Sequence, residues 1–91
     1  MEQSNKKVYY IGGRSYSPED SILLCRASEI FVTTSLYRTK KGALFLMQES
    51  ELEKPVVKLL DESAAKAFLD EHAAGIVVEN YNAVFGTPEP G

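Results

Sequence analysis

The sequence predicts a small α+β domain: an antiparallel sheet of four to five strands with two helices on one face, in the order ββαβββα. Two glycines at positions 12 and 13 separate two short runs of β-branched and aromatic residues, as in a tight hairpin. Residues 31–46 form the longest β-type stretch, with a basic tip in its middle. An alanine-rich stretch after Asp61 has apolar residues at helical spacing. These three patterns together favour a sheet with helices packed against it.

Length and composition are those of one soluble domain. The chain has 91 residues, of which 44% are hydrophobic and 25% charged. We expect a flexible N-terminus over residues 1–6, a single domain over residues 7–86 and a flexible tail over residues 87–91. No apolar run reaches the ~18 residues of a membrane helix, and the first residues lack the apolar core of a signal peptide, so no membrane association is predicted. The single cysteine, Cys25, excludes an internal disulfide and favours a reduced, cytoplasmic setting.

The first predicted element is a hairpin over residues 7–16. Glycine reaches positive φ without steric cost, so Gly12 and Gly13 suit the turn between its two strands. A nucleotide-binding loop is excluded, because two adjacent glycines without a Gly-Lys-Ser/Thr or Gly-x-Gly-x-x-Gly pattern are not a phosphate-binding signature.

A helix is predicted over residues 18–28. Residues 17–20 read Ser-Pro-Glu-Asp, in which the serine suits the N-cap, the proline the first helical position and the aspartate a reciprocal cap. The apolar run over residues 22–27 supplies a broad face for the core. We expect Cys25 to be a small buried residue of that face, because free cysteines are usually buried and the only histidine lies far along the chain.

The central hairpin is predicted over residues 30–48. On the core-facing side of its first strand we expect Ile30, Val32, Thr34 and Leu36, with Arg38 at the exposed end. Residues 39–42, Thr-Lys-Lys-Gly, form the turn, in which the glycine takes the left-handed conformation. Residues 43–48 return as a strand that is apolar on both sides and therefore central, and residues 56–60 supply a further strand.

The end of the chain is predicted to be helical. Asp61 caps a helix over residues 62–74, and the glycine that follows ends it. His72 lies in the last turn, where an imidazole favours the negative end of the helix. Residues 76–78 fit either a strand or a helix, and residues 79–85 indicate a short helix.

Four short motifs appear in a recognisable order. Residues 12–17 read Gly-Gly-Arg-Ser-Tyr-Ser, residues 35–46 Ser-Leu-Tyr-Arg-Thr-Lys-Lys-Gly-x-x-Phe-Leu, residues 59–65 Leu-Leu-Asp-Glu-x-x-Ala and residues 81–86 Tyr-Asn-Ala-Val-Phe-Gly. This order resembles a family of small uncharacterised bacterial proteins, often associated with phages and mobile elements, with a central Leu-Tyr-Arg-Thr-Lys-x-Gly-x-x-Phe-Leu type motif. Members of that family usually have Glu at the position of Ser35 and a Gly-rich stretch at residues 49–53. The resemblance therefore implies a fold type and a phage or mobile-element setting, and no activity.

The sequence contains no catalytic constellation, and we expect a protein that is not an enzyme. One histidine and one cysteine, far apart in the chain, do not make a nucleophile and base by their spacing. The carboxylates gather in a polar loop at residues 49–53, at a helix cap and on an exposed helix face, whereas acid–base chemistry needs them in a desolvated cleft. Residues 49–53 also lack the spacing of a calcium loop. No cofactor and no metal site is predicted.

Charge is divided unevenly along the chain. Residues 1–42 hold seven Lys/Arg against four Asp/Glu, whereas residues 43–91 hold three against nine, which together give the net charge of −3. The basic part suits an anionic partner, but an acidic total argues against strong nonspecific binding to nucleic acid.

The candidate binding residues gather at the central turn: Tyr37, Arg38, Lys40 and Lys41, joined by Arg14, Lys6 and Lys7 if the first hairpin lies beside the second. We expect a small non-catalytic binding or adaptor protein with an unknown protein partner, because a sheet covered on one face leaves aromatic residues for a partner, or for a second copy in a homodimer. The alternative is a weak nucleic-acid-binding module, in which the cations bind phosphates and Tyr37 stacks on a base. A simpler interpretation is that the lysines keep the turn soluble and protect the sheet edges.

Overall fold

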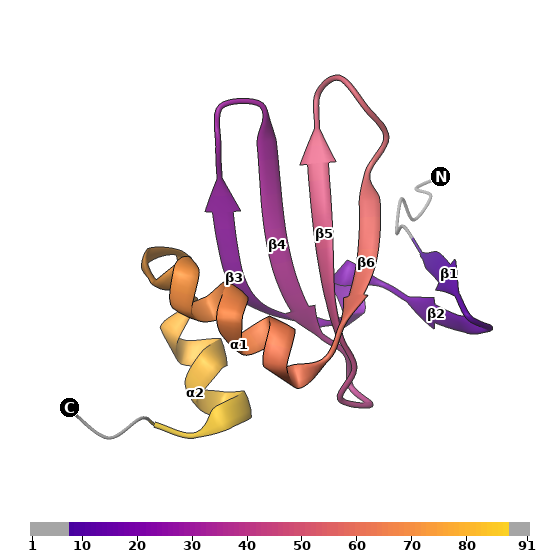
Figure 1. The fold of residues 1–91 in the computed structure, drawn as a ribbon. Helices are drawn as coiled ribbons and strands as arrows, with labels where there is room; N and C mark the ends of the chain where they lie inside the picture. Colours follow the sequence, from indigo (N-terminus) through magenta and orange to yellow (C-terminus); the bar gives the residue numbers. More distant parts are fainter. Residues whose placement is uncertain (1–7, 88–91) are drawn as a thin grey trace, which may run out of the picture.

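The computed structural model describes residues 8–87 and shows an α+β domain (Figure 1). Its strands are β1 (Tyr9–Ile11), β2 (Arg14–Tyr16), β3 (Ile22–Ser28), β4 (Val32–Arg38), β5 (Leu44–Ser50) and β6 (Val56–Leu60). Its helices are α1 (Glu62–Glu71) and α2 (Val78–Phe85), with short 3₁₀ turns η1 (Pro18–Asp20) and η2 (Ala73–Gly75). The predicted fold class is confirmed. The predicted N-terminal segment at residues 1–6 and residues 88–91 of the predicted tail lie outside the described residues.

The domain has three layers. The four long strands form one antiparallel sheet in the order β3-β4-β5-β6, and β1 pairs with β2 in a separate two-stranded ribbon. Both α1 and α2 lie on one face of the sheet, as predicted (Figure 1). The ribbon packs over part of the other face, which the sequence had left open for a partner.

The glycine turn of the ribbon is confirmed. Gly12 and Gly13 have φ of 58° and 79°, values that glycine adopts without strain, and they join β1 to β2 as the two central residues of a tight turn.

The helix predicted over residues 18–28 is wrong. Only Pro18–Asp20 is helical, as a single 3₁₀ turn, and the apolar run after it is strand β3. Ser17 has the extended backbone of an N-cap, but its side chain makes no capping hydrogen bond. The order is therefore six strands followed by two helices rather than ββαβββα.

A β-bulge explains why β3 has the sequence pattern of a helix. Its register with β4 shifts between Leu23 and Cys25, so that one extra residue is inserted. Leu24 and Cys25 are consecutive, yet both are buried in the cluster under the helices. Leu23 contacts the cluster on the opposite face. The run therefore lacks the alternation of a simple strand, and only the tertiary packing decides between strand and helix.

Strand β4 begins later than predicted. Ile30 and Phe31 were expected in the strand, with Ile30 facing the core, but both lie in the turn before Val32. Ile30 is 90% exposed and is not a core residue. The turn that follows β4 is as predicted, with Gly42 at φ 93°.

The C-terminal helices largely follow the prediction. An oxygen of the Asp61 side chain accepts a hydrogen bond from the backbone N–H of Ala64 at 2.7 Å, which caps α1. The helix ends at Glu71, three residues earlier than expected, and η2 follows. The open question at residues 76–78 has a mixed answer, since Ile76 makes an isolated bridge to Cys25 and α2 begins at Val78.

Two apolar clusters lie on the two faces of the sheet. The cluster under the helices contains the buried residues Leu24, Cys25, Leu36, Ala65 and Leu69. The cluster under the ribbon contains Tyr16, Tyr37, Phe45 and Met47. Neighbouring residues of β4 thus serve opposite layers, which is the alternation expected of a strand buried on both sides.

The edge of β3 is covered by the chain that leads into α2. The backbone N–H of Val77 donates to the carbonyl of Leu24 at 2.9 Å, and the Asn80 amide donates to the carbonyl of Leu23 at 2.9 Å. These bonds satisfy carbonyls at the bulge and leave β6 as the other edge of the sheet. Gly75 lies against the Arg26 backbone, and a side chain there would overlap the Arg26 carbonyl.

We expect Gly75→Ala to lower the free energy of unfolding by about 1–3 kcal/mol, because the added methyl pushes η2 away from β3. Urea unfolding followed by circular dichroism measures this change. Ala74→Ser, at the exposed neighbouring position, is the matched control and should stay within about 0.5 kcal/mol of the wild type. Equal stability of Gly75→Ala and the wild type would contradict the close contact.

Candidate binding surface

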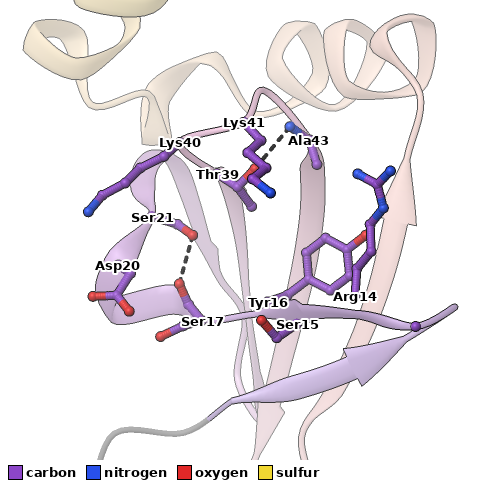
Figure 2. A pocket seen from close by; sticks show the side chains of 11 residues that line it. Arg14, Ser15, Tyr16, Ser17, Asp20, Ser21, Thr39, Lys40, Lys41 and Ala43 are labelled. Atoms are coloured by element: carbon purple, nitrogen blue, oxygen red, sulfur yellow. Dashed lines mark hydrogen bonds between the residues drawn. The ribbon is translucent and has the colours of Figure 1, made fainter.

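A cleft of about 470 Å³ lies between the ribbon and the turn that joins β4 to β5 (Figure 2). We call it the basic cleft. It is lined among others by Arg14, Ser15, Ser17, Asp20, Lys40 and Lys41. Segments far apart in the sequence therefore bring three of the predicted binding residues to one place.

The lysine wall of the basic cleft is a closed turn. The Thr39 N–H donates to the Ala43 carbonyl at 2.8 Å, and the Ala43 N–H donates to the Thr39 side-chain oxygen at 3.0 Å. The Gly42 N–H donates to the Thr39 carbonyl at 2.9 Å. Lys40 and Lys41 are thus exposed on a backbone that is held by three hydrogen bonds.

The opposite wall comes from β2 and η1. The Ser21 hydroxyl donates to the Ser17 carbonyl at 2.7 Å and holds the start of β3 against η1 (Figure 2). The Ser17 hydroxyl oxygen is buried and has no hydrogen-bond partner within the described residues. Ser17 is also one of the residues that line the basic cleft.

Arg14 owes its position to Tyr16. These residues are two apart on β2 and point to the same side of the ribbon. Tyr16 is buried against Phe45, with an edge-to-face arrangement and 5.7 Å between ring centroids. In Figure 2, Lys41 lies between Lys40 on one side and Arg14 on the other. Three cations and the carboxylate of Asp20 give the cleft a positive balance suited to an anion.

Two predicted residues are not part of the basic cleft. Tyr37 is only 8% exposed and stacks on Phe45 with 5.2 Å between ring centroids, so it is a core residue. Arg38 pairs with Ile22 and Leu44 on the face that carries the helices. The predicted patch is thus divided, and Lys6 and Lys7 lie outside the described residues.

Sequence reasoning missed a polar contact beside this core. Arg26 donates from Nε to the Ser35 hydroxyl at 3.1 Å and from its terminal nitrogen to the Tyr37 hydroxyl at 3.5 Å. Arg26 and Ser35 are cross-strand partners in β3 and β4. The contact was hidden because Arg26 was assigned to a helix, and only the strand register reveals it.

The surroundings of Cys25 and His72 indicate structural roles for both residues. The thiol of Cys25 is fully buried and donates to the His72 backbone carbonyl at 3.3 Å. Burial raises the pKa of the Cys25 thiol, which disfavours the reactive thiolate. The His72 ring lies against Phe68, with 4.6 Å between ring centroids. Within residues 8–87, no group of three or more His, Cys, Asp or Glu side chains is arranged to hold a metal ion.

We expect the free energy of unfolding to fall as pH rises above about 8.5, where the unfolded cysteine ionises. Because burial raises the folded-state pKa of Cys25, the native state binds more protons than the unfolded state there. The stabilisation is complete below that pH and is lost as pH rises, at no more than about 1.4 kcal/mol per pH unit.

Urea unfolding between about pH 8 and pH 9 measures this slope, where tyrosines with an ordinary pKa of about 10 remain largely protonated. Cys25→Ala is the control and should lower the stability while removing the slope. The pKa of Tyr9 is also raised, by burial and by the nearby charge of Glu49, so both proteins should lose stability at higher pH. An identical slope in the variant would contradict the assignment to Cys25.

Comparison with known proteins identifies no relative. No protein-family model, curated protein or solved structure matches this chain. No helix within residues 8–87 is long and apolar enough to cross a membrane. The resemblance to phage-associated proteins therefore stays a prediction.

Proposed function

We propose that this protein is a non-catalytic binding module that holds an anionic segment of a partner protein in the basic cleft. The main support for this proposal is that Arg14, Lys40 and Lys41 all line the basic cleft. Their backbones are fixed by the glycine turn of the ribbon and by the closed turn before β5. A binding surface of this kind needs little ordering when the partner arrives.

The chemistry of the cleft favours carboxylates. An arginine can bind a carboxylate through two parallel hydrogen bonds, and lysines add charge without a fixed geometry. The hydroxyls of Ser15 and Ser17 lie in the same lining. A short acidic segment with a few carboxylates matches this small number of cations.

A nucleic acid is the second candidate, because the same three cations suit backbone phosphates. Three phosphate contacts would give a slope of only about −3 in log affinity against log salt. Tyr37 is buried and does not offer a ring for base stacking. The net charge of −3 also repels a long polyanion. These features support an acidic protein segment over DNA or RNA.

The setting follows from the resemblance. A phage or mobile-element protein of this size suits a cytoplasmic adaptor that binds a host or phage protein. The partner in the alternative form of this proposal is a second copy of the same chain, which would give a homodimer. Light scattering distinguishes a monomer from a homodimer.

We expect the triple variant Arg14→Ala/Lys40→Ala/Lys41→Ala to bind a fluorescent glutamate-rich peptide about tenfold more weakly than the wild type, since each exposed charge pair contributes up to about 1 kcal/mol. Fluorescence anisotropy measures the affinity across a salt series. The matched control is Lys54→Ala/Lys58→Ala/Lys66→Ala, which removes the same charge from exposed positions outside the cleft.

Single-stranded DNA and RNA serve as parallel probes. Tighter binding of either nucleic acid than of the peptide, lost in the cleft variant alone, would favour the second candidate. Equal loss in the two triple variants would show a general charge effect and would refute a role for the basic cleft.

A further inference from the structure

The turn between β3 and β4 carries two large apolar side chains at its apex. The Glu29 N–H donates to the Val32 carbonyl at 2.8 Å and closes the turn. The register continues from the pair Ser28 and Thr33, so Ile30 and Phe31 are the two central residues. Ile30 is 90% exposed and Phe31 is 65% exposed.

These residues are unsuited to their position. Two-residue hairpin turns favour Asn and Gly, because the preferred turn types need positive φ. Within residues 8–87, only glycines have positive φ, so Ile30 and Phe31 hold the turn in a less favoured conformation. Both also expose apolar surface to water. Neither residue contributes to a core cluster, so the fold itself does not explain their presence.

One more exposed apolar side chain and several carboxylates lie at the same end of the sheet as the apex. The loop between β5 and β6 lies at the same end of the sheet (Figure 1) and carries Leu52, which is 79% exposed. A hollow of about 500 Å³ beside the apex is lined by Ile30 and Phe31 and has a negative balance, because three carboxylates and one cation line it: Glu29, Glu49, Glu51 and Arg26. This end of the sheet is therefore apolar at its tips and acidic around them.

We propose that Ile30 and Phe31, with Leu52 at the same end of the sheet, pack against an apolar surface bordered by lysine or arginine on a partner protein. The apolar tips supply the buried surface, and the carboxylates pair with the cations at the rim. This contact lies at the opposite end of the sheet from the basic cleft and does not depend on it.

The carboxylates also argue against two other occupants. A cytoplasmic membrane surface is anionic and repels Glu29, Glu49 and Glu51. A second copy meeting the same end would bring like charges together. The basic cleft of a second copy has the right charge, and self-association through it is one of the outcomes that the test below distinguishes.

The test uses a substitution that should improve the turn while removing the contact. Ile30→Asn with Phe31→Gly places the favoured turn sequence at the apex, so the melting temperature should stay the same or rise by about 2–5 °C. The probe is a fluorescent helical peptide with a leucine stripe and lysines at its other positions. We expect the double variant to bind this peptide at least tenfold more weakly than the wild type.

A second double variant, Ile30→Ser with Phe31→Ser, should weaken binding of the peptide to the same extent, although it introduces no glycine at the apex. Val78→Ser is the matched control, because Val78 is 66% exposed at the start of α2, away from the apex, and its replacement should leave binding unchanged. Replacing the lysines of the peptide by glutamates, or its leucines by serines, should abolish binding to the wild type.

Several results would overturn the proposal. One is equal affinity of the wild type and both apex variants for the peptide. A second is a fall in melting temperature in both variants, which would make the apex a structural element. A third is binding of the wild type, but not the variants, to phosphatidylcholine or phosphatidylserine vesicles in place of the peptide. The last is self-association of the wild type that the apex substitutions remove.

Discussion

The packing of Tyr16 on Phe45 is the contact on which the arrangement of the domain depends. Phe45 is fully buried in the middle of the sheet and contacts Tyr37 on one side and Tyr16 on the other. Aromatic pairs of this kind contribute about 0.5–1.5 kcal/mol each beyond the surface that they bury. A ribbon of three-residue strands has no stability of its own, so this contact holds it on the sheet. The basic cleft exists only because Arg14 is carried to Lys40 and Lys41 on that ribbon.

The antiparallel sheet also separates charge and polarity between its two ends. Consecutive strands reverse direction, so the turn after β4 lies at one end, and the turns after β3 and β5 lie at the other. The first end gathers cations and hydroxyls around a cleft, whereas the second gathers carboxylates around exposed apolar tips. The two ends of the sheet therefore have different chemistry, and the cations of the first end all come from the basic part of the chain, residues 1–42.

Local chemistry made some of this predictable from the sequence. Gly12, Gly13 and Gly42 take the positive φ that their turns require, and Asp61 caps its helix, because each of these features depends on a few neighbouring residues. The fold class followed from the same signals. The placement of Arg14 beside the lysines was stated only as a condition, because the packing of the ribbon depends on Tyr16 and Phe45, which are far apart in the chain. The burial of Tyr37 was missed for the same reason.

The two errors of secondary structure have different physical meanings. Residues 22–28 were assigned to a helix because a bulge and burial on both faces remove the alternation of a strand, and the folded structure accounts for every apolar residue in that run. Ile30 and Phe31 were assigned to a strand because their residue types favour one, and the folded structure gives them no packing in return. In the first case a tertiary contact overrides local preference. In the second, local preference and solvation both oppose the observed conformation and nothing within residues 8–87 compensates, so the reason for these two side chains is sought in a partner.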